Sequence, residues 1–170
     1  MAGEWFHILY SNVYGLRTRV LRLTNTYGPC MRIRDNRQTF LGIWIKLILE
    51  GNPFEVWGGT QLRDFLYVED CVDALLLTMT RTEANAKIYN LGGNNIISLK
   101  DLADILVEIN RSGNYVCREF PEDRKRIDIG DYYSDYSLIH KELGWEPRVT
   151  LEKGLEITLE YFRKHKENYL

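Results

Sequence analysis

The sequence contains few of the residues that build disulfide frameworks, metal sites or catalytic triads. Its three cysteines, Cys30, Cys71 and Cys117, are odd in number, far apart and without a Cys-x-x-Cys pair. This spacing argues against a disulfide framework and against a zinc site. Its three histidines stand at unrelated positions, and the sequence reveals no serine, cysteine or carboxylate partner for any of them. We therefore expect no metal and a reducing, cytoplasmic setting.

The sequence also lacks an excess of either charge and long apolar runs. Its 22 basic and 24 acidic residues give a net charge of -2, so nucleic acid and anionic membranes are not favoured partners. No apolar run reaches the roughly 20 residues of a membrane-spanning helix. The first twenty residues carry Glu4, His7, Arg17 and Arg19, where a signal peptide would need an apolar core. Any anion site must therefore be local.

Apolar residues instead recur at helical spacing, with short extended runs between the helical segments. The spacing predicts helices over residues 2–14, 39–50, 69–80, 98–109, 137–143 and 151–165. Short apolar runs predict strands over residues 19–24, 54–57, 88–91 and 115–120. In the helix at 69–80, we expect the buried stripe to consist of Val72, Leu75, Leu76 and Met79. The alternation predicts an α/β or α+β fold.

Residues 58–70 form the first candidate site. Two glycines follow the strand at 54–57, and Arg63 and Asp64 come next in an expected polar loop. Glu69 and Asp70 are then expected to cap a helix. A guanidinium offers a planar fork of donors that fits phosphate, and Asp64 is placed to orient it. A surface ion pair beside a helix cap explains the same pattern. The shape of the motif alone leaves both interpretations open.

Two further positions are candidates for ligand binding. Asn25 begins an expected turn at 25–29, directly after the strand at 19–24, where ligands bind in open α/β sheets. It is equally suited to capping that turn. The consecutive cations Arg124, Lys125 and Arg126 form a second possible anion site, although such a run is usually a solvated face. Trp57 is suited either to stacking on a planar ligand or to core packing.

Four segments in order, residues 22–29, 63–70, 89–93 and 143–147, resemble the carboxyl-terminal half of NAD-dependent nucleotide-sugar epimerases and dehydratases. These enzymes are the extended short-chain dehydrogenase/reductases. The resemblance implies a Rossmann-like α/β fold. It assigns residues 1–30 to a remnant of the Rossmann domain. Residues 31–170 become the substrate-binding portion, with some segments returning to the Rossmann sheet.

The resemblance also implies a nucleoside diphosphate sugar as ligand and NAD as cofactor of the intact enzyme. It assigns substrate binding to Asn25, Thr39, Phe40, Leu41, Val56, Trp57, Arg63 and Arg126. Asn25 and Arg63 would contact the diphosphate, and Val56 and Trp57 would line the nucleobase pocket. It places Leu23, Thr24, Tyr27 and Pro29 near the nicotinamide. Many members carry a second diphosphate-binding arginine where this sequence has Asp128, and Arg126 lies two residues further upstream.

The family's catalytic groups are not in this sequence. Members use an amino-terminal Gly-rich loop for NAD and a Tyr-x-x-x-Lys pair, and family spacing places that lysine just before Met1. The helix at 2–14 also begins without a cap, which suggests missing upstream sequence. We therefore expect no catalytic residue here, no activity of this chain alone, and no NAD binding without the missing half.

Two functions remain open. The first is the substrate-binding half of an enzyme that oxidises a sugar hydroxyl to a keto intermediate with bound NAD, as an epimerase or dehydratase. The second is a non-catalytic remnant that serves as a binding or assembly module, for example by pairing with a separate NAD-binding half. In both cases, a shortened sheet would expose Val20, Leu21 and the helix at 2–14, which predicts self-association or a homodimer.

Overall fold

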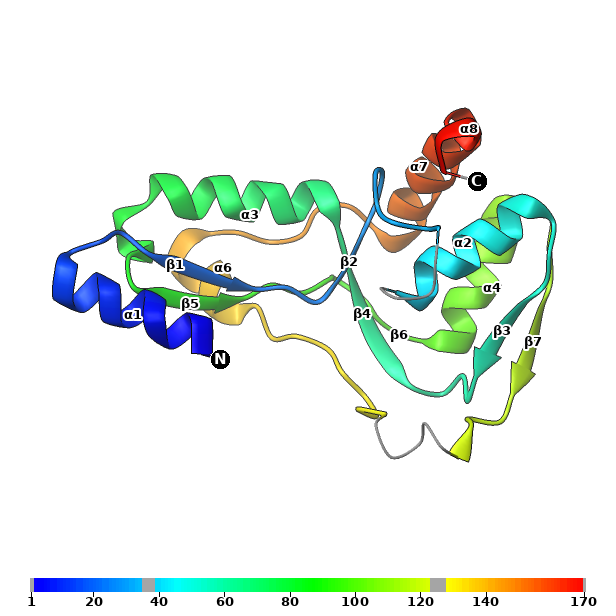
Figure 1. Cartoon of the computed structure of the whole chain (residues 1–170), viewed down its shortest axis with the longest axis horizontal. Helices are drawn as coiled ribbons and strands as arrows, with labels where there is room; N and C mark the ends of the chain where they lie inside the picture. The colour runs from blue at the N-terminus through cyan, green and yellow to red at the C-terminus, as the bar shows by residue number, and fades with distance from the viewer. Residues whose placement is uncertain (1, 35–38, 123–127, 170) are drawn as a thin grey trace.

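The computed structural model describes residues 2–34, 39–122 and 128–169, which form a chain of helices and short strands (Figure 1). The helices are α1 (Ala2–Tyr14), α2 (Phe40–Glu50), α3 (Val68–Thr80), α4 (Leu99–Asn110), α6 (Ser137–Leu143), α7 (Leu151–Lys164) and α8 (Lys166–Tyr169), with a 3-10 turn, η1, at Thr82–Ala84. The strands are β1 (Arg19–Arg22), β2 (Asn25–Tyr27), β3 (Phe54–Trp57), β4 (Leu62–Tyr67), β5 (Lys87–Asn90), β6 (Ile96–Ser98) and β7 (Tyr115–Arg118). The predicted α/β class is confirmed.

The strands pair in three small sheets. β1 pairs with β5 and β3 pairs with β7, both in parallel. In the third sheet β4 is central, parallel to β2 on one side and antiparallel to β6 on the other. Figure 1 shows β2 and β4 passing between the part of the molecule that holds α1, α3 and α6 and the part that holds α2, α4 and α7. β4 therefore links both halves of the structure.

Two apolar clusters hold these elements together. The larger one packs α2, α4 and α7 against β2, β3 and β4, and the smaller one packs α3, α6 and β5. Tyr27 is at the centre of the larger cluster, where its ring meets that of Tyr67 edge to face at 5.7 Å. A Cβ at Gly154 of α7 would lie 2.1 Å from the Tyr27 hydroxyl oxygen, so α7 packs very closely against β2.

Hydroxyl side chains cap the starts of three helices. Thr39 accepts from the Gly42 amide before α2, Ser98 from the Asp101 amide before α4, and Thr150 from the Lys153 amide before α7. The capped helices form the wall of the larger apolar cluster. Local sequence therefore sets where these helices start.

The predicted buried face of α3 is wrong. Val72, Leu75, Leu76 and Met79 are between 43% and 69% exposed. The helix buries Cys71, Ala74 and Thr78 instead, because β5 and α6 pack on that neighbouring face. Helical spacing identifies an apolar stripe, but two adjacent stripes on one helix can both be apolar, and only packing decides which one is covered.

The other local corrections concern residues 25–29 and the start of α3. Asn25 to Tyr27 form β2 rather than a turn, because they pair with Phe65 to Tyr67 of β4. Helix α3 begins one residue earlier than expected, after Tyr67, and without a side-chain cap. Asp70 does not cap it, since its carboxylate accepts from the Val149 amide at 3.0 Å.

Candidate functional site

Arg63 lies in strand β4 rather than in a polar loop, and only 7% of it is exposed. Its Nη1 atom donates to the carbonyl oxygens of Leu62 and Gly130. Its Nη2 atom lies 3.7 Å from Oδ1 of Asp128. The expectation of a loop is wrong because β2 and β6 both pair with this segment and extend it. The guanidinium is therefore a buried cation with one nitrogen on backbone carbonyls and the other facing a carboxylate.

Asp64 does not orient Arg63, which corrects the sequence-based interpretation. Successive side chains of a strand point to opposite faces, so the two neighbours diverge. Asp64 is 1% exposed, and its carboxylate accepts from the hydroxyl of Thr24 and from the amides of Gly93 and Ser134, at 3.1 and 3.2 Å for the amides. It thus ties together the ends of β1 and β5 and the segment before α6.

A tight glycine contact supports this arrangement. A Cβ at Gly93 would lie 2.1 Å from the carbonyl oxygen of Phe65, and one at Gly92 would lie 2.9 Å from the Asp64 carboxylate. Only glycine lets the chain after β5 approach β4 so closely. The glycine pair that the sequence shows at this turn therefore places the turn against β4, beside Asp64.

Asn25 and the residues at the start of α2 come together on the other side of β4. Asn25 lies opposite Phe65 in the parallel pair, and its Nδ2 donates to the carbonyl oxygen of Asp64 at 3.0 Å. Thr39, Phe40 and Leu41 line one small pocket with Asn25 and Phe65. The cavity measures about 10 Å³, room for about one water molecule. Four of the predicted substrate residues are therefore neighbours in space.

Val56 and Trp57 lie apart from this pocket, on the β3–β7 pair (Figure 1). Val56 is fully buried in the larger apolar cluster. The Trp57 indole donates to a carboxylate oxygen of Glu55 at 3.1 Å, and its ring meets that of Phe120 edge to face. Hydrogen bonds from Trp57 and Arg118 lower the pKa of Glu55. Trp57 is therefore half-buried, whereas the side chain of Val56 is too deeply buried to contact a ligand.

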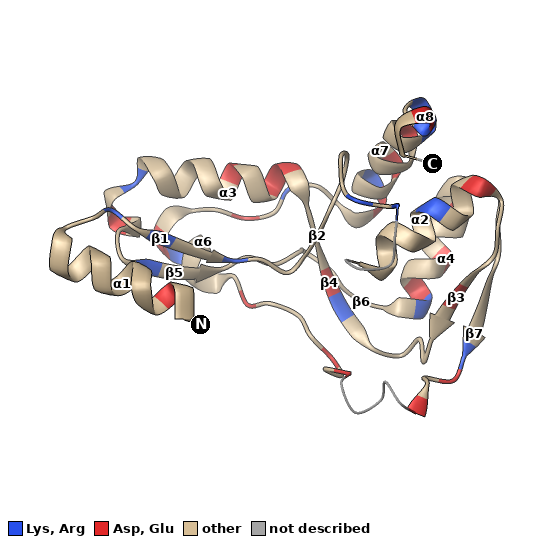
Figure 2. Ribbon diagram, in the orientation of Figure 1, with Lys and Arg blue, Asp and Glu red and all other residues tan. Residues whose placement is uncertain are grey.

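Arg126 and the cation run 124–126 lie outside the described residues. The next described position on that segment, Asp128, is the one that faces Arg63. Over the rest of the molecule, Lys and Arg are interspersed with Asp and Glu, as Figure 2 shows. The described residues therefore form no extended basic face, and an anion site at Arg63 stays a prediction.

Two of the four residues expected near the nicotinamide, Thr24 and Tyr27, have their hydroxyl groups bonded within the chain. The Thr24 hydroxyl is bonded to Asp64, and the Tyr27 hydroxyl donates to the Leu151 carbonyl at 3.2 Å. Burial of Tyr27 raises its pKa well above the usual value. Leu23 is exposed and Pro29 is half-buried, so they offer at most one wall of a cofactor pocket.

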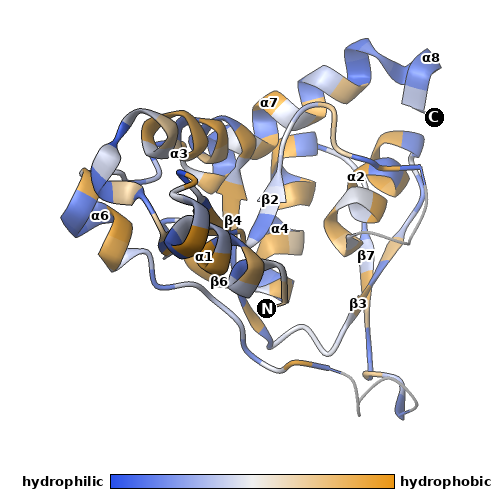
Figure 3. Cartoon of the chain, turned by 60° about the vertical axis from the view of Figure 1, so that its left-hand side comes forward, coloured by the Kyte–Doolittle hydropathy of each residue, from blue (hydrophilic) through white to orange (hydrophobic). Residues whose placement is uncertain are grey.

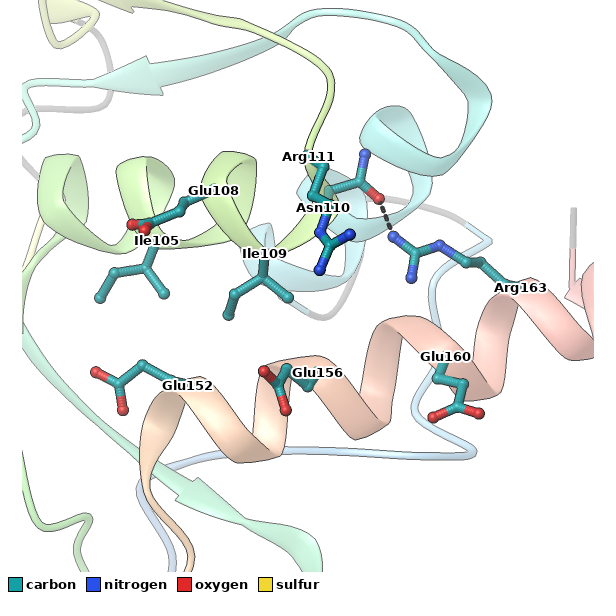
Figure 4. Close-up of a pocket in the computed structure, with 9 residues that line it drawn as sticks. All are labelled: Ile105, Glu108, Ile109, Asn110, Arg111, Glu152, Glu156, Glu160 and Arg163. Atoms are coloured by element: carbon teal, nitrogen blue, oxygen red, sulfur yellow. Dashed lines mark hydrogen bonds between the residues drawn. The ribbon is translucent and has the colours of Figure 1, made fainter.

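A wide groove between α4 and α7, of about 1010 Å³, has no counterpart in the sequence-based prediction (Figure 4). It is lined by Ile105, Glu108, Ile109, Asn110, Arg111, Glu152, Glu156, Glu160 and Arg163. The Arg163 guanidinium donates to the Asn110 side chain at 2.6 Å. The four glutamates of the groove outnumber its two arginines, so the groove is negative overall. Such a surface repels an anionic ligand, so the groove does not fit a nucleotide sugar.

Comparison with known proteins identifies the family. The model of the NAD dependent epimerase/dehydratase family matches residues 1–92, more than half of the 170-residue chain. The chain belongs to this family. A dTDP-glucose 4,6-dehydratase of Streptomyces griseus is 32% identical over 166 residues, which cover 97% of this chain and 48% of that protein. A UDP-glucuronate 4-epimerase of Thermodesulfobacterium geofontis is 32% identical over 167 residues, with 97% and 49% coverage.

A solved member of the epimerase/dehydratase family has the same fold. The structure of a UDP-glucose 4-epimerase from Thermotoga maritima with UDP-glucose matches with a TM-score of 0.87 and 31% identity, over 97% of this chain and 52% of that one. The chain thus spans about half the length of the relatives it matches. The predicted family and the Rossmann-like α/β fold are both confirmed.

The described residues contain no group of three or more His, Cys, Asp or Glu placed to hold a metal ion. None of the helices they form is both long and apolar enough to cross a membrane.

Proposed function

We propose that this chain is the portion of an NAD-dependent sugar epimerase or dehydratase that binds the nucleoside diphosphate sugar. The diphosphate binds at Arg63 and Asn25, with residues 39–41 beside it and Trp57 toward the nucleobase. The intact enzyme oxidises a sugar hydroxyl to a keto intermediate with NAD. This chain supplies binding groups only, so it is inactive alone. The reaction class, isomerase or lyase, depends on groups in the remaining half.

One observation carries the proposal. Arg63 and Phe65 are two residues apart on β4, so their side chains leave the same face of the strand, roughly 7 Å apart. Phe65 lines the small pocket together with Asn25 and the start of α2. A ligand that lies across this face therefore meets a buried cation at one end and an amide at the other. That pairing suits a diphosphate, which needs charge and directed donors together.

Calorimetric titration with UDP-glucose tests the proposal. The wild-type chain should bind weakly, Arg63→Lys should bind less tightly because a point charge replaces the planar fork, and Arg63→Ala should lose binding. Arg163→Ala is the matched control, since Arg163 lies in the acidic groove and should not affect affinity. Circular dichroism establishes that each variant is folded. A folded wild-type chain that does not bind, or unchanged affinity in Arg63→Ala, would contradict the proposal.

An assembly role is the second candidate, and the exposed apolar surface favours it. Helix α1 exposes Trp5, Phe6, Leu9, Tyr10, Val13 and Tyr14, and α3 exposes Val72, Leu75, Leu76 and Met79. Figure 3 shows hydrophobic stretches, in orange, along α1 and α3. A groove of about 350 Å³ between β1 and α3 is lined by Arg17, Arg19, Leu21, Leu23, Leu75, Thr78 and Met79. Among the described residues, β1 pairs on one edge only, with β5. An exposed apolar surface and an unpaired strand edge of this kind indicate a binding partner, either a second copy of this chain or a separate NAD-binding half.

Sedimentation velocity over a range of concentrations tests this candidate. We expect self-association that weakens in Trp5→Lys, with Lys46→Glu on α2 as a control away from the apolar face. A monodisperse monomer at every concentration would argue against self-association. The DNA upstream of Met1 separates the two functions. An in-frame Tyr-x-x-x-Lys pair preceded by a Gly-rich loop favours the enzyme, and an unrelated upstream gene favours the assembly module.

A further inference from the structure

Asp128 faces the nitrogen of Arg63 that an anionic ligand has to meet. The Nη1 atom of Arg63 is already used by two carbonyl oxygens, those of Leu62 and Gly130. Its Nη2 atom faces Oδ1 of Asp128 at 3.7 Å. Charge-assisted hydrogen bonds are shorter, about 2.7–2.9 Å, so this contact is an ion pair without a hydrogen bond. The carboxylate therefore balances the charge of Nη2 without using its protons.

The position of Asp128 is set by the fold. The segment that follows it is bound to β4 at consecutive points: Leu62 donates its amide to Asp131 at 2.8 Å, and Tyr132 donates its amide to the Leu62 carbonyl at 3.0 Å. Further along, Ser134 donates its amide to Asp64. These bonds hold the segment beside Arg63. Asp128 thus stays close to the guanidinium whether or not a ligand is present.

From this geometry we propose that Asp128 determines the affinity and charge preference of the Arg63 anion site. Its carboxylate lies 3.7 Å from Nη2, so a phosphate that binds this nitrogen lies close to a second negative charge. The inference rests on the proposed function, since it assumes that Arg63 binds the diphosphate. It predicts that the natural site binds diphosphates weakly and discriminates against ligands in proportion to their negative charge.

The size of the effect follows from Coulomb's law. A carboxylate about 5 Å from a phosphate, at an effective dielectric between those of a protein surface and water, weakens binding by about tenfold for each phosphate charge that it faces. Replacing Asp128 by asparagine removes this repulsion and keeps the shape of the side chain. Asp128 is partly exposed and accepts no hydrogen bond that the structure shows among the described residues, so the variant should fold.

The test is calorimetric titration of the full chain with inorganic pyrophosphate and then with UDP-glucose. Asp128→Asn should bind pyrophosphate about tenfold more tightly than the wild type. It should bind inorganic phosphate with a smaller gain. Asp135→Asn is the matched control, because it makes the same change in net charge on the same segment but, among the residues that the structure describes, bonds to Ser137 rather than to Arg63. In the double variant with Arg63→Lys, the gain should shrink, which ties the effect to the guanidinium.

The outcomes separate this inference from the proposed function. If UDP-glucose binding depends on Arg63 while Asp128→Asn leaves both affinities unchanged or weaker, the inference is wrong and the proposed function stands. An equal gain in Asp135→Asn would also overturn it, since the effect would then be one of net charge. If neither the wild type nor Asp128→Asn binds pyrophosphate or UDP-glucose, both proposals fail.

Discussion

Asp64 joins three segments of the chain, so its replacement should affect stability more than any surface change. In Asp64→Asn one carboxylate oxygen becomes an NH₂ group, which is a donor. The carboxylate accepts from the Gly93 and Ser134 amides and from the Thr24 hydroxyl, and the residue is 1% exposed. At least one of these donors loses its acceptor and faces another donor. Leaving a buried donor unsatisfied costs about 1–3 kcal/mol.

We therefore expect Asp64→Asn to lower the free energy of unfolding by about 2–4 kcal/mol, once the repulsion between donors is added to the lost bond. Urea denaturation followed by circular dichroism measures the change through the shift in midpoint. Thr24→Val is the matched control, because it removes one donor and leaves the carboxylate with its two amides. It should lower the free energy of unfolding by only about 1 kcal/mol.

The double variant separates the shared bond from the rest of the network. Thr24 and Asp64 bond directly, so the two changes should be less than additive. Hydrogen exchange of the Gly93 amide should accelerate in Asp64→Asn and not in Thr24→Val. An Asp64→Asn variant that loses less than about 1 kcal/mol, or no more than Thr24→Val, would refute the role of Asp64 as the junction of these segments.

Three further predictions concern packing, reactivity and pH. Gly154→Ala should lower the free energy of unfolding by about 1–3 kcal/mol, measured by thermal denaturation, because its Cβ would overlap the Tyr27 hydroxyl. Cys71 should react with a thiol reagent far more slowly than the exposed cysteines, because burial covers it and raises its pKa. Hydrogen bonds from Tyr89 and Lys87 lower the pKa of Glu142 from 4.5. The ionised Glu142 carboxylate therefore stabilises the fold fully above about pH 4.5, and this stabilisation is lost as the pH falls through the lowered pKa of the folded state. Glu142→Gln should therefore reduce the loss of stability in acid denaturation.

Each of these has its own control. Gly3→Ala serves for the packing prediction, since nothing lies within 4 Å of a Cβ there, and an equal effect of both alanines would contradict it. Three equally fast thiols in the folded protein would contradict the burial of Cys71. For Glu142, Glu160→Gln makes the same change in net charge at an exposed glutamate of α7 and tests whether net charge alone moves the acid transition, and the same response in both variants would count against the hydrogen bonds.

Elements with strong local signals were predictable from sequence. The helices α1, α2, α4 and α7 follow from apolar spacing, and the hydroxyl caps Ser98 and Thr150 mark the starts of α4 and α7. Strand β2 was missed because Asn25 and Gly28 are typical turn residues. It is a strand because β4 pairs with it, and that partner lies 40 residues further along the chain. Pairing over such a distance leaves no periodic signal.

The candidate site was likewise only partly predictable from the sequence. Sequence alone singled out Arg63 and Asn25, because a guanidinium suits phosphate and an amide after a parallel strand lies at the usual ligand edge. It misjudged the role of Asp64, since whether neighbours cooperate depends on strand alternation, and alternation applies only once the segment is known to be a strand. The carbonyl oxygens that hold Arg63 come from residues 62 and 130 and carry no signature of their own.

The sequence by itself determined the family, the α/β class, the starts of α4 and α7 and the residue types available to bind an anion. These depend on local chemistry and on motif order, which a chain carries before it folds. Tertiary structure alone decided which face of α3 is covered, that Asp64 joins three segments, and that Asp128 confronts Arg63. Each of these depends on which distant segments meet, and that is set by the total burial and hydrogen bonding of the folded chain rather than by any one stretch.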